Sequence, residues 1–367
     1  MRSLHDTIGR LAALRTRPQG SYAPVGDELP ELGGFGSNPG ALRAQYHVPE
    51  GLAEGAPLVV VLHGCTQTAS GYNHNSGWSK LADERGFALL FPEQQRANNP
   101  NLCFNWFSRA DASRDSGEAL SIRQMVAAIQ FAHSTDPDRI FVTGLSAGGA
   151  MAAVMLATYP EVFAGGAVIA GLPYGVADTV PEAFDLMRGH GIPGAGELTD
   201  LVRDASDYAG PWPTLSVWHG GSDATVDPVN ARALVEQWRK LHGAAEAPAR
   251  EEMVDGYPHR AWCDPNGRTV VEEYAIPGMS HGTPLSTREP GSHEVAGAYM
   301  LEAGISSTRR TAEFWGIGDN GAQHLPRPVA AKEAKPAARR ETPAAVPVST
   351  GVQKTIEDAL RSAGLMR

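Results

Sequence analysis

The 367-residue sequence is poor in cysteine and contains no long apolar run. Its three cysteines, Cys65, Cys103 and Cys263, are too few for a disulfide framework, and no CxxC pair suggests zinc binding or redox cycling. We therefore expect neither a metal site nor a cofactor. No segment approaches the roughly 18 apolar residues that span a bilayer, so no integral membrane segment is expected.

The sequence also lacks an excess of positive charge. Its formal net charge is -10 at pH 7, and its pI is near 5.6. This charge argues against a protein that binds nucleic acid by neutralising phosphates. A neutral or polymeric substrate fits the composition better.

A secretory signal is not apparent at the amino terminus. Residues 1–18 lack the continuous apolar core that such a signal needs, so the sequence predicts a cytoplasmic protein, with secretion as the alternative. Free thiols are the expectation in a reducing cytoplasm. A bond between Cys65 and Cys103 remains open, and its formation would favour export.

Short apolar runs alternate with helical patterns over most of the chain. Residues 41–48 alternate like an edge strand, and residues 57–62 (PLVVVL) form a run typical of a buried parallel strand. Further strands are expected at 87–91, 139–143, 163–170, 215–218 and 270–276, and helices at 119–133, 147–159, 229–241 and 306–315. This order predicts an α/β fold with a mostly parallel sheet and helices on both faces.

Composition divides the chain into four parts. Residues 1–34 form a helix and connector, and residues 35–320 form the main domain, with a cap-like insertion at about 172–213. Residues 321–350 are an Ala/Pro-rich linker, because this composition cannot bury enough apolar surface to fold alone. Residues 351–367 return to amphipathic helical spacing. That helix either docks on the chain's own surface or contacts a partner or an apolar granule.

The strongest motif is Gly-Leu-Ser-Ala-Gly at 144–148. It follows the strand RIFVT and immediately precedes a helical pattern, which is the context of a nucleophile elbow. Glycines are needed in such an elbow because side chains would collide with the neighbouring strand and helix. The motif predicts Ser146 as the nucleophile of an α/β-hydrolase.

A serine nucleophile needs a base and a carboxylate that orients it, in the chain order Ser, Asp or Glu, His. Asp223 follows the strand at 215–218 and is our candidate carboxylate. Asp227 competes with it, but Asp227 is better placed to cap the helix that begins near Val229.

The base is expected after the last strand of the sheet. His281, in the Gly-flanked segment PGMSHGTP, occupies that place. His259 and His293 are the alternatives, whereas His63 and His219 are interpreted as structural residues of their turns.

The oxyanion of the reaction needs two backbone NH donors. Ala147, the residue after the nucleophile, supplies one. The loop LHGCTQ supplies the other, through the NH of Cys65 or of Thr66. Cys65 would thus act through its backbone.

Six ordered motifs, LHGCTQTASGY, GFALLFPEQ, CFNWF, RDSGEALSIRQM, GLSAGGAM and PGMSHGTP, resemble the poly(3-hydroxybutyrate) depolymerase family of esterases. That family is similar to the carbohydrate esterases that remove feruloyl and acetyl groups. The resemblance covers about residues 35–317. It implies Ser146, Asp223 and His281 as a triad, with the Cys65 and Ala147 backbones as the oxyanion hole. It also implies a bond between Cys65 and Cys103 that stiffens the oxyanion loop.

Other side chains are candidates for the surroundings of the site. Trp106, Tyr174 and Trp212 fall in loops where they could bind a hydroxybutyrate or feruloyl unit, or simply pack the cap. Residues 114–118 contain Arg114, Ser116 and Glu118, which form either a polar cluster that braces the site or a helix cap.

These expectations describe a serine esterase that hydrolyses polyhydroxyalkanoate polyester or oligoester bonds through an acyl-enzyme on Ser146. The alternative is a feruloyl or acetyl esterase acting on polysaccharide-derived esters. A third hypothesis is a non-catalytic adaptor that binds a granule or a partner through residues 351–367. An intact triad argues against the adaptor.

Overall fold

A computed structural model describes residues 29–317. The predicted amino-terminal helix, the linker and the terminal helix at 351–367 lie outside the described residues. A nine-stranded sheet dominates this part, in the order β1-β3-β2-β4-β5-β6-β9-β8-β7. Its strands are β1 (Arg43–His47), β2 (Leu58–Leu62), β3 (Ala88–Glu93), β4 (Ile140–Leu145), β5 (Gly165–Ile169), β6 (Thr214–Gly220), β7 (Arg250–Val254), β8 (Tyr257–Cys263) and β9 (Thr269–Ile276).

The six central strands, from β3 to β9 in this order, are parallel. Every residue of β2 is buried, because alternate side chains enter the cores on opposite faces of the sheet. β1 pairs antiparallel with β3 at the edge of the sheet, as the alternation of residues 41–48 predicted. The parallel core places the carboxyl ends of its strands at one edge, where the site is built.

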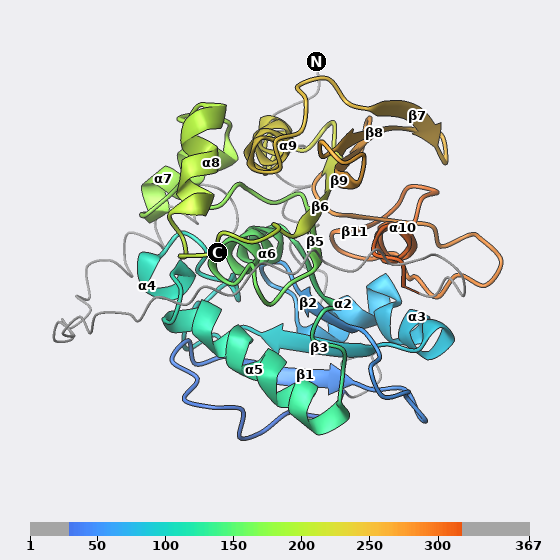
Figure 1. Cartoon of the computed structure of the whole chain (residues 1–367). Helices are drawn as coiled ribbons and strands as arrows, with labels where there is room; N and C mark the ends of the chain where they lie inside the picture. The colour runs from blue at the N-terminus through green and yellow to red at the C-terminus, as the bar shows by residue number, and fades with distance from the viewer. Residues whose placement is uncertain (1–28, 318–367) are drawn as a thin grey trace, which may run out of the picture.

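Helices cover both faces of the sheet (Figure 1). On one face lie α5, α6 and α9, and on the other lie α2, α3 and α10. The helices are α2 (Ala69–Ser76), α3 (Trp78–Arg85), α4 (Arg109–Ala112), α5 (Gly117–His133), α6 (Ala147–Thr158), α7 (Val180–Met187), α8 (Ala195–Arg203), α9 (Val229–Leu241) and α10 (Ser307–Phe314). The predicted α/β class is confirmed.

The hairpin of β7 and β8 is absent from the sequence-based expectations. It pairs antiparallel with β9 and extends the sheet at its far edge. β7 (REEMV) is mostly exposed, and β8 (YPHRAWC) is only partly buried. Neither strand has the apolar run by which the central strands were found. A small sheet of β10 (Thr283–Leu285) and β11 (Met300–Glu302) follows.

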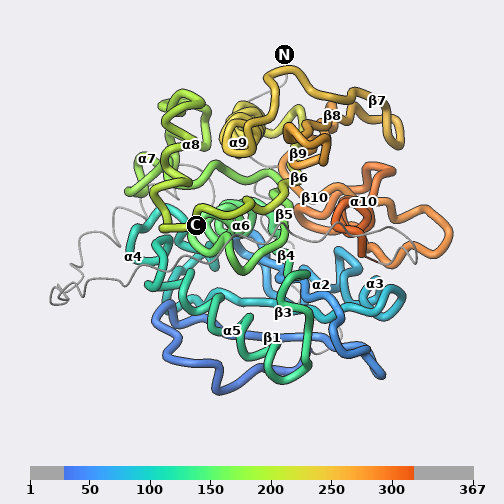
Figure 2. The backbone as a smooth tube through the Cα atoms, viewed as in Figure 1, coloured from blue at the N-terminus to red at the C-terminus, as the bar shows by residue number. Residues whose placement is uncertain are grey.

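The insertion between β5 and β6 contains α7 and α8, and its tube lies beside α9 in Figure 2. Both helices lie within the cap-like insertion expected at about 172–213. Proline at the first turn and a hydrogen bond from the Glu182 NH to the Thr179 hydroxyl fix the start of α7. Across residues 29–317, no helix has the length and apolarity needed to cross a membrane.

Candidate active site

Ser146 lies between the end of β4 and the start of α6, with φ 56° and ψ -117°. This positive φ is costly for a residue with a Cβ and is characteristic of functional turns. A Cβ on Gly144 would lie 2.4 Å from the backbone of Gly148, and a Cβ on Gly148 would lie 2.3 Å from the Leu62 carbonyl oxygen. Both glycines are therefore required for the close approach of α6 to β2 and β4.

His281 and Asp223 meet behind this elbow. Nδ1 of His281 lies 2.7 Å from Oδ2 of Asp223, and His281 lines a cavity together with Ser146. Asp227 instead accepts a hydrogen bond from the Val229 NH at the start of α9, at 2.8 Å. The geometry thus separates the two carboxylates, one beside the candidate base and the other at a helix terminus.

The Asp223 carboxylate interacts with several hydrogen-bond donors. Its Oδ1 accepts hydrogen bonds from the Thr225 and Val226 NH groups, and its Oδ2 lies 3.4 Å from Nε2 of His219. Burial alone would raise the pKa of Asp223, but the contacts with His219 and His281 outweigh it and hold that pKa well below its usual range. Asp223 is therefore charged wherever His281 acts as a base.

The other histidines considered have structural surroundings. His259 lies between β-strand carboxylates, 3.0 Å from Glu272, and His293 pairs with Glu84 at 2.5 Å. His63 accepts a hydrogen bond from the Gln94 NH through Nε2, so its Nδ1 donates to the Gly64 carbonyl. Its structural role in the turn before Cys65 agrees with the sequence interpretation.

The loop after β2 leaves one candidate oxyanion donor. The Thr66 NH donates to the Asn101 carbonyl oxygen at 2.7 Å, so it is not available to a substrate. Within residues 29–317, the NH groups of Cys65 and Ala147 have no acceptor. Cys65 and Ala147 also line the cavity beside Ser146, where two such donors suit a developing oxyanion.

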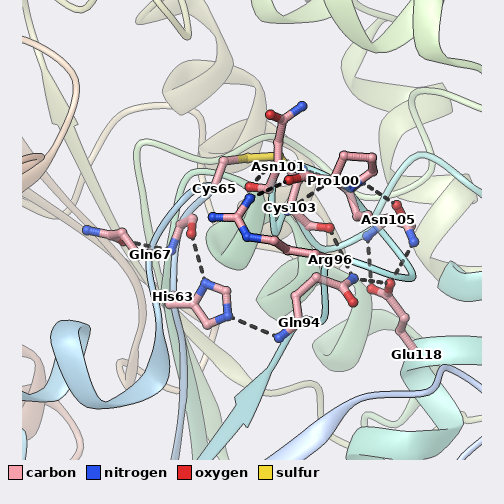
Figure 3. Close-up of a disulfide and its surroundings, with 12 residues drawn as sticks. His63, Cys65, Gln67, Gln94, Arg96, Pro100, Asn101, Cys103, Asn105 and Glu118 are labelled. Carbon is pink, nitrogen blue, oxygen red and sulfur yellow. Dashed lines mark hydrogen bonds between the residues drawn. A yellow bond between two sulfur atoms is a disulfide. The ribbon is translucent and has the colours of Figure 1, made fainter. Parts of the chain in front are cut away.

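Cys65 and Cys103 form a disulfide (Figure 3). The expectation of free thiols at these two positions was wrong, whereas the pairing implied by the family resemblance is confirmed. The bond joins the loop after β2 to the 94–105 segment, which closes over the same cavities. It thereby fixes the backbone that carries the Cys65 NH.

Glu118, in the first turn of α5, holds the same segment from the other side (Figure 3). It is fully buried and accepts hydrogen bonds from Gln94 at 2.6 Å and from the NH and side chain of Asn105 at 2.9 and 2.8 Å. Burial raises the pKa of Glu118 to about 8, with a further contribution from Asp111, although these hydrogen bonds oppose the shift. The bracing role considered for Glu118 agrees with this geometry.

Arg114 and Ser116 do not join Glu118. Arg114 forms an ion pair with Glu161 at 2.7 Å, and the Ser116 hydroxyl makes no capping bond to α5. Arg114 and Ser116 precede the first residue of α5, Gly117, whereas Glu118 lies within the helix, so the three neighbouring residues do not share one face.

Two cavities meet at Ser146, each of about 90 Å³. The first contains His281, with polar neighbours Thr66, Gln67, Thr225 and Tyr299. The second lacks His281 and has mostly apolar walls that include Trp106, Leu172, Val180, Phe184 and Val226. Both are lined by Cys65, Asn101, Cys103, Ser146 and Met187.

Of the three aromatic candidates, the structure brings only Trp106 to these cavities. Tyr174 lines a separate cavity, which Trp106 also borders. Trp212 packs edge-to-face on Tyr208, with ring centroids 5.6 Å apart, and lines neither cavity. The sequence did not identify Asn101, Tyr299 and the α7 residues as lining the cavities at Ser146. The apolar side of α7 is visible in the sequence, but the sequence does not say which loop it faces.

Among the described residues, no group of three or more His, Cys, Asp or Glu side chains is arranged to hold a metal ion. The acid-base and hydrogen-bonding groups gathered at Ser146 are those that acyl transfer through a serine requires.

Known proteins resemble this chain along most of its length. The sequence pattern of the family described as "Esterase PHB depolymerase" matches residues 42–254. Poly(3-hydroxyalkanoate) depolymerase C of Paucimonas lemoignei is 47% identical over 298 residues, covering 79% of this chain and 70% of that protein. An acetylxylan esterase of Coprinopsis cinerea is 31% identical, covering 75% of this chain and 74% of that protein.

The fold is shared with a solved esterase. The acetyl xylan esterase from Aspergillus awamori superimposes with a TM-score of 0.67 at 25% identity, covering 79% of this chain and 99% of that one. The pattern match over the elbow and the sheet, the relatives and the arrangement at Ser146 agree. The chain belongs to the Esterase PHB depolymerase family, and it is a carboxylic ester hydrolase with the α/β-hydrolase fold.

Proposed function

We propose that this protein hydrolyses the ester bonds of polyhydroxyalkanoates or their oligomers through an acyl-enzyme on Ser146. The observation that carries the proposal is the 2.7 Å contact of His281, which lines a cavity together with Ser146, with the buried Asp223. The 47% identity to a poly(3-hydroxyalkanoate) depolymerase supports the substrate class.

In this mechanism His281 removes the proton of the Ser146 hydroxyl as it attacks the ester carbonyl. Asp223 holds the imidazole in the required tautomer and stabilises the imidazolium that forms. The tetrahedral oxyanion accepts hydrogen bonds from the Cys65 and Ala147 NH groups. His281 then protonates the leaving alkoxide, and water, deprotonated by His281, attacks the acyl-enzyme and releases the acid.

Ser146→Ala tests the proposal directly. The variant should fold as the parent does by circular dichroism and lose at least about 10³-fold in kcat on p-nitrophenyl butanoate and on a 3-hydroxybutyrate trimer. Ser37→Ala is a matched control, because its hydroxyl bonds to Gln124 on the surface of α5. Retained activity in Ser146→Ala would refute the assignment.

A second candidate is the removal of acetyl or feruloyl groups from polysaccharide fragments. The acetylxylan esterase relative and the similar solved structure favour it. Acetylated xylo-oligosaccharides and methyl ferulate assayed beside 3-hydroxybutyrate oligomers distinguish the two. A kcat/KM at least tenfold higher on the oligomers supports the polyester, and the reverse order supports the polysaccharide ester.

The disulfide supports the exported alternative over the cytoplasmic one, because such bonds persist in oxidising compartments. Fractionation of the native cells tests this, with activity outside the cytoplasm as the expected result.

Contact of residues 351–367 with a granule or partner stays a proposal. A chain truncated before residue 325 should then bind polymer granules more weakly while hydrolysing p-nitrophenyl butanoate normally.

A further inference from the structure

The side chain of Asn101 is buried beside Ser146 without a partner. It is 9% exposed, and its Nδ2 has no hydrogen-bond acceptor among residues 29–317. Asn101 lines both cavities that meet at Ser146. Figure 3 shows its amide pointing away from the polar network around Glu118. A buried unpaired donor is destabilising in the free protein, so it requires an explanation.

The backbone around this amide is firmly held. The Asn101 carbonyl accepts the Thr66 NH at 2.7 Å, and the Asn101 NH donates to the Asn99 side chain at 3.0 Å. Two residues further, Cys103 is bonded to Cys65. All these contacts leave the Asn101 side chain free, so the amide is presented to the cavities by a rigid loop.

In the proposed mechanism the two cavities bind different parts of the ester. His281 protonates the leaving alkoxide, so the cavity that contains His281 receives the alcohol part of the ester. The other cavity, beside Ala147 and under α7, therefore receives the acyl part. It is the side on which the acyl-enzyme remains after the first step.

The acyl-side cavity offers little else to a polar substrate. Its side chains are mostly apolar, and the amide of Asn99 is already engaged by the Asn101 and Cys103 NH groups and by Asn105. Of the described side chains that line this cavity, Asn101 is the one with a fully buried donor that has no hydrogen-bond partner. This cavity suits an acyl chain that is apolar except for one hydrogen-bond acceptor.

We propose that Asn101 Nδ2 donates a hydrogen bond to the oxygen on carbon 3 of a 3-hydroxyacyl unit bound on the acyl side of Ser146. This inference rests on the proposed function and narrows it, because a plain acyl or acetyl group has no such oxygen. A plain acyl chain leaves the donor unpaired, so the site discriminates against it. Asn101 is then a specificity-determining residue for hydroxyacid polyesters.

The test compares Asn101→Leu with the parent on p-nitrophenyl 3-hydroxybutanoate and p-nitrophenyl butanoate. The two esters share a leaving group and differ in the 3-oxygen. We expect kcat/KM to fall about tenfold for the hydroxy ester and less than twofold for the butanoate. Asn266→Leu, in the exposed turn after β8, is the matched control and should change neither value.

Asn101→Ala removes the donor without introducing a charge beside the oxyanion, so it should show the same selective loss. The melting temperature of Asn101→Leu should equal or exceed that of the parent, because the unpaired amide is gone. Equal losses on both esters would mean that Asn101 is a third oxyanion donor or has a structural role. No loss on either ester would mean that Asn101 does not contact the 3-oxygen. Either result overturns the inference. An inactive parent enzyme would instead refute the proposed function.

Discussion

Nδ1 of His281 lies 2.7 Å from Oδ2 of Asp223. The contact joins the loop after β9 to the loop after β6, two neighbouring parallel strands whose carboxyl ends lie at the same edge of the sheet. The His281–Asp223 contact therefore depends on the register of these two strands. Asp223 contacts the histidine and Asp227 caps α9, and substitutions can test these separate roles.

Asp223→Asn should lower kcat on p-nitrophenyl butanoate by about 10⁴-fold, because an amide does not hold the imidazole in the catalytic tautomer. KM should change little. Asp227→Asn is the control, since Asn caps a helix as well as Asp does and the Val229 NH keeps its acceptor. If Asp227→Asn caused the larger loss, the carboxylates would have been assigned the wrong way round.

Removing the disulfide should weaken both fold and site. Cys65 and Cys103 are 38 residues apart, and a cross-link over a loop of this length stabilises by about 4 kcal/mol in the chain-entropy view. Urea unfolding of a Cys65→Ala, Cys103→Ala double variant should show a loss of this order, with reduced kcat. Cys263→Ala, at a free cysteine, should change little. An unchanged unfolding midpoint and kcat in the double variant would contradict the bracing role.

Glu294 should make stability depend on pH. It accepts hydrogen bonds from the Ser286 NH and the Ser306 hydroxyl, both at 2.6 Å, and burial raises its pKa from 4.5 to about 7. The folded state thus retains a proton that the unfolded state releases. The stabilisation is complete below about pH 4.5 and is lost as pH rises to about 7, a change of about 3 kcal/mol.

Glu294→Gln, which cannot ionise, should remove this dependence. The measurement is the free energy of unfolding in urea at pH 5 and pH 7.5 for both proteins. The parent should lose more stability than the variant between the two pH values. Parallel changes in the two proteins would show that Glu294 does not retain its proton on folding.

Some features follow from short stretches of chain. The elbow at Ser146 was predictable because a buried strand, a tight glycine turn and a helix follow one another within residues 139–159, and their steric demands are local. The central strands were found for a similar reason, since a strand buried on both faces must be apolar at every position. The β7–β8 hairpin was missed because an exposed antiparallel edge has no such requirement.

Sequence alone determined the fold class, the candidate nucleophile and the order of the candidate acid-base residues, because these depend on local sterics and on the succession of strands and helices. Tertiary structure decided which of Asp223 and Asp227 reaches His281, whether Cys65 and Cys103 join, and which aromatic residue borders the cavity. It also placed the unpaired amide of Asn101 beside Ser146. These outcomes depend on how closely segments far apart in the chain approach one another, a distance that packing sets and that spacing along the sequence does not.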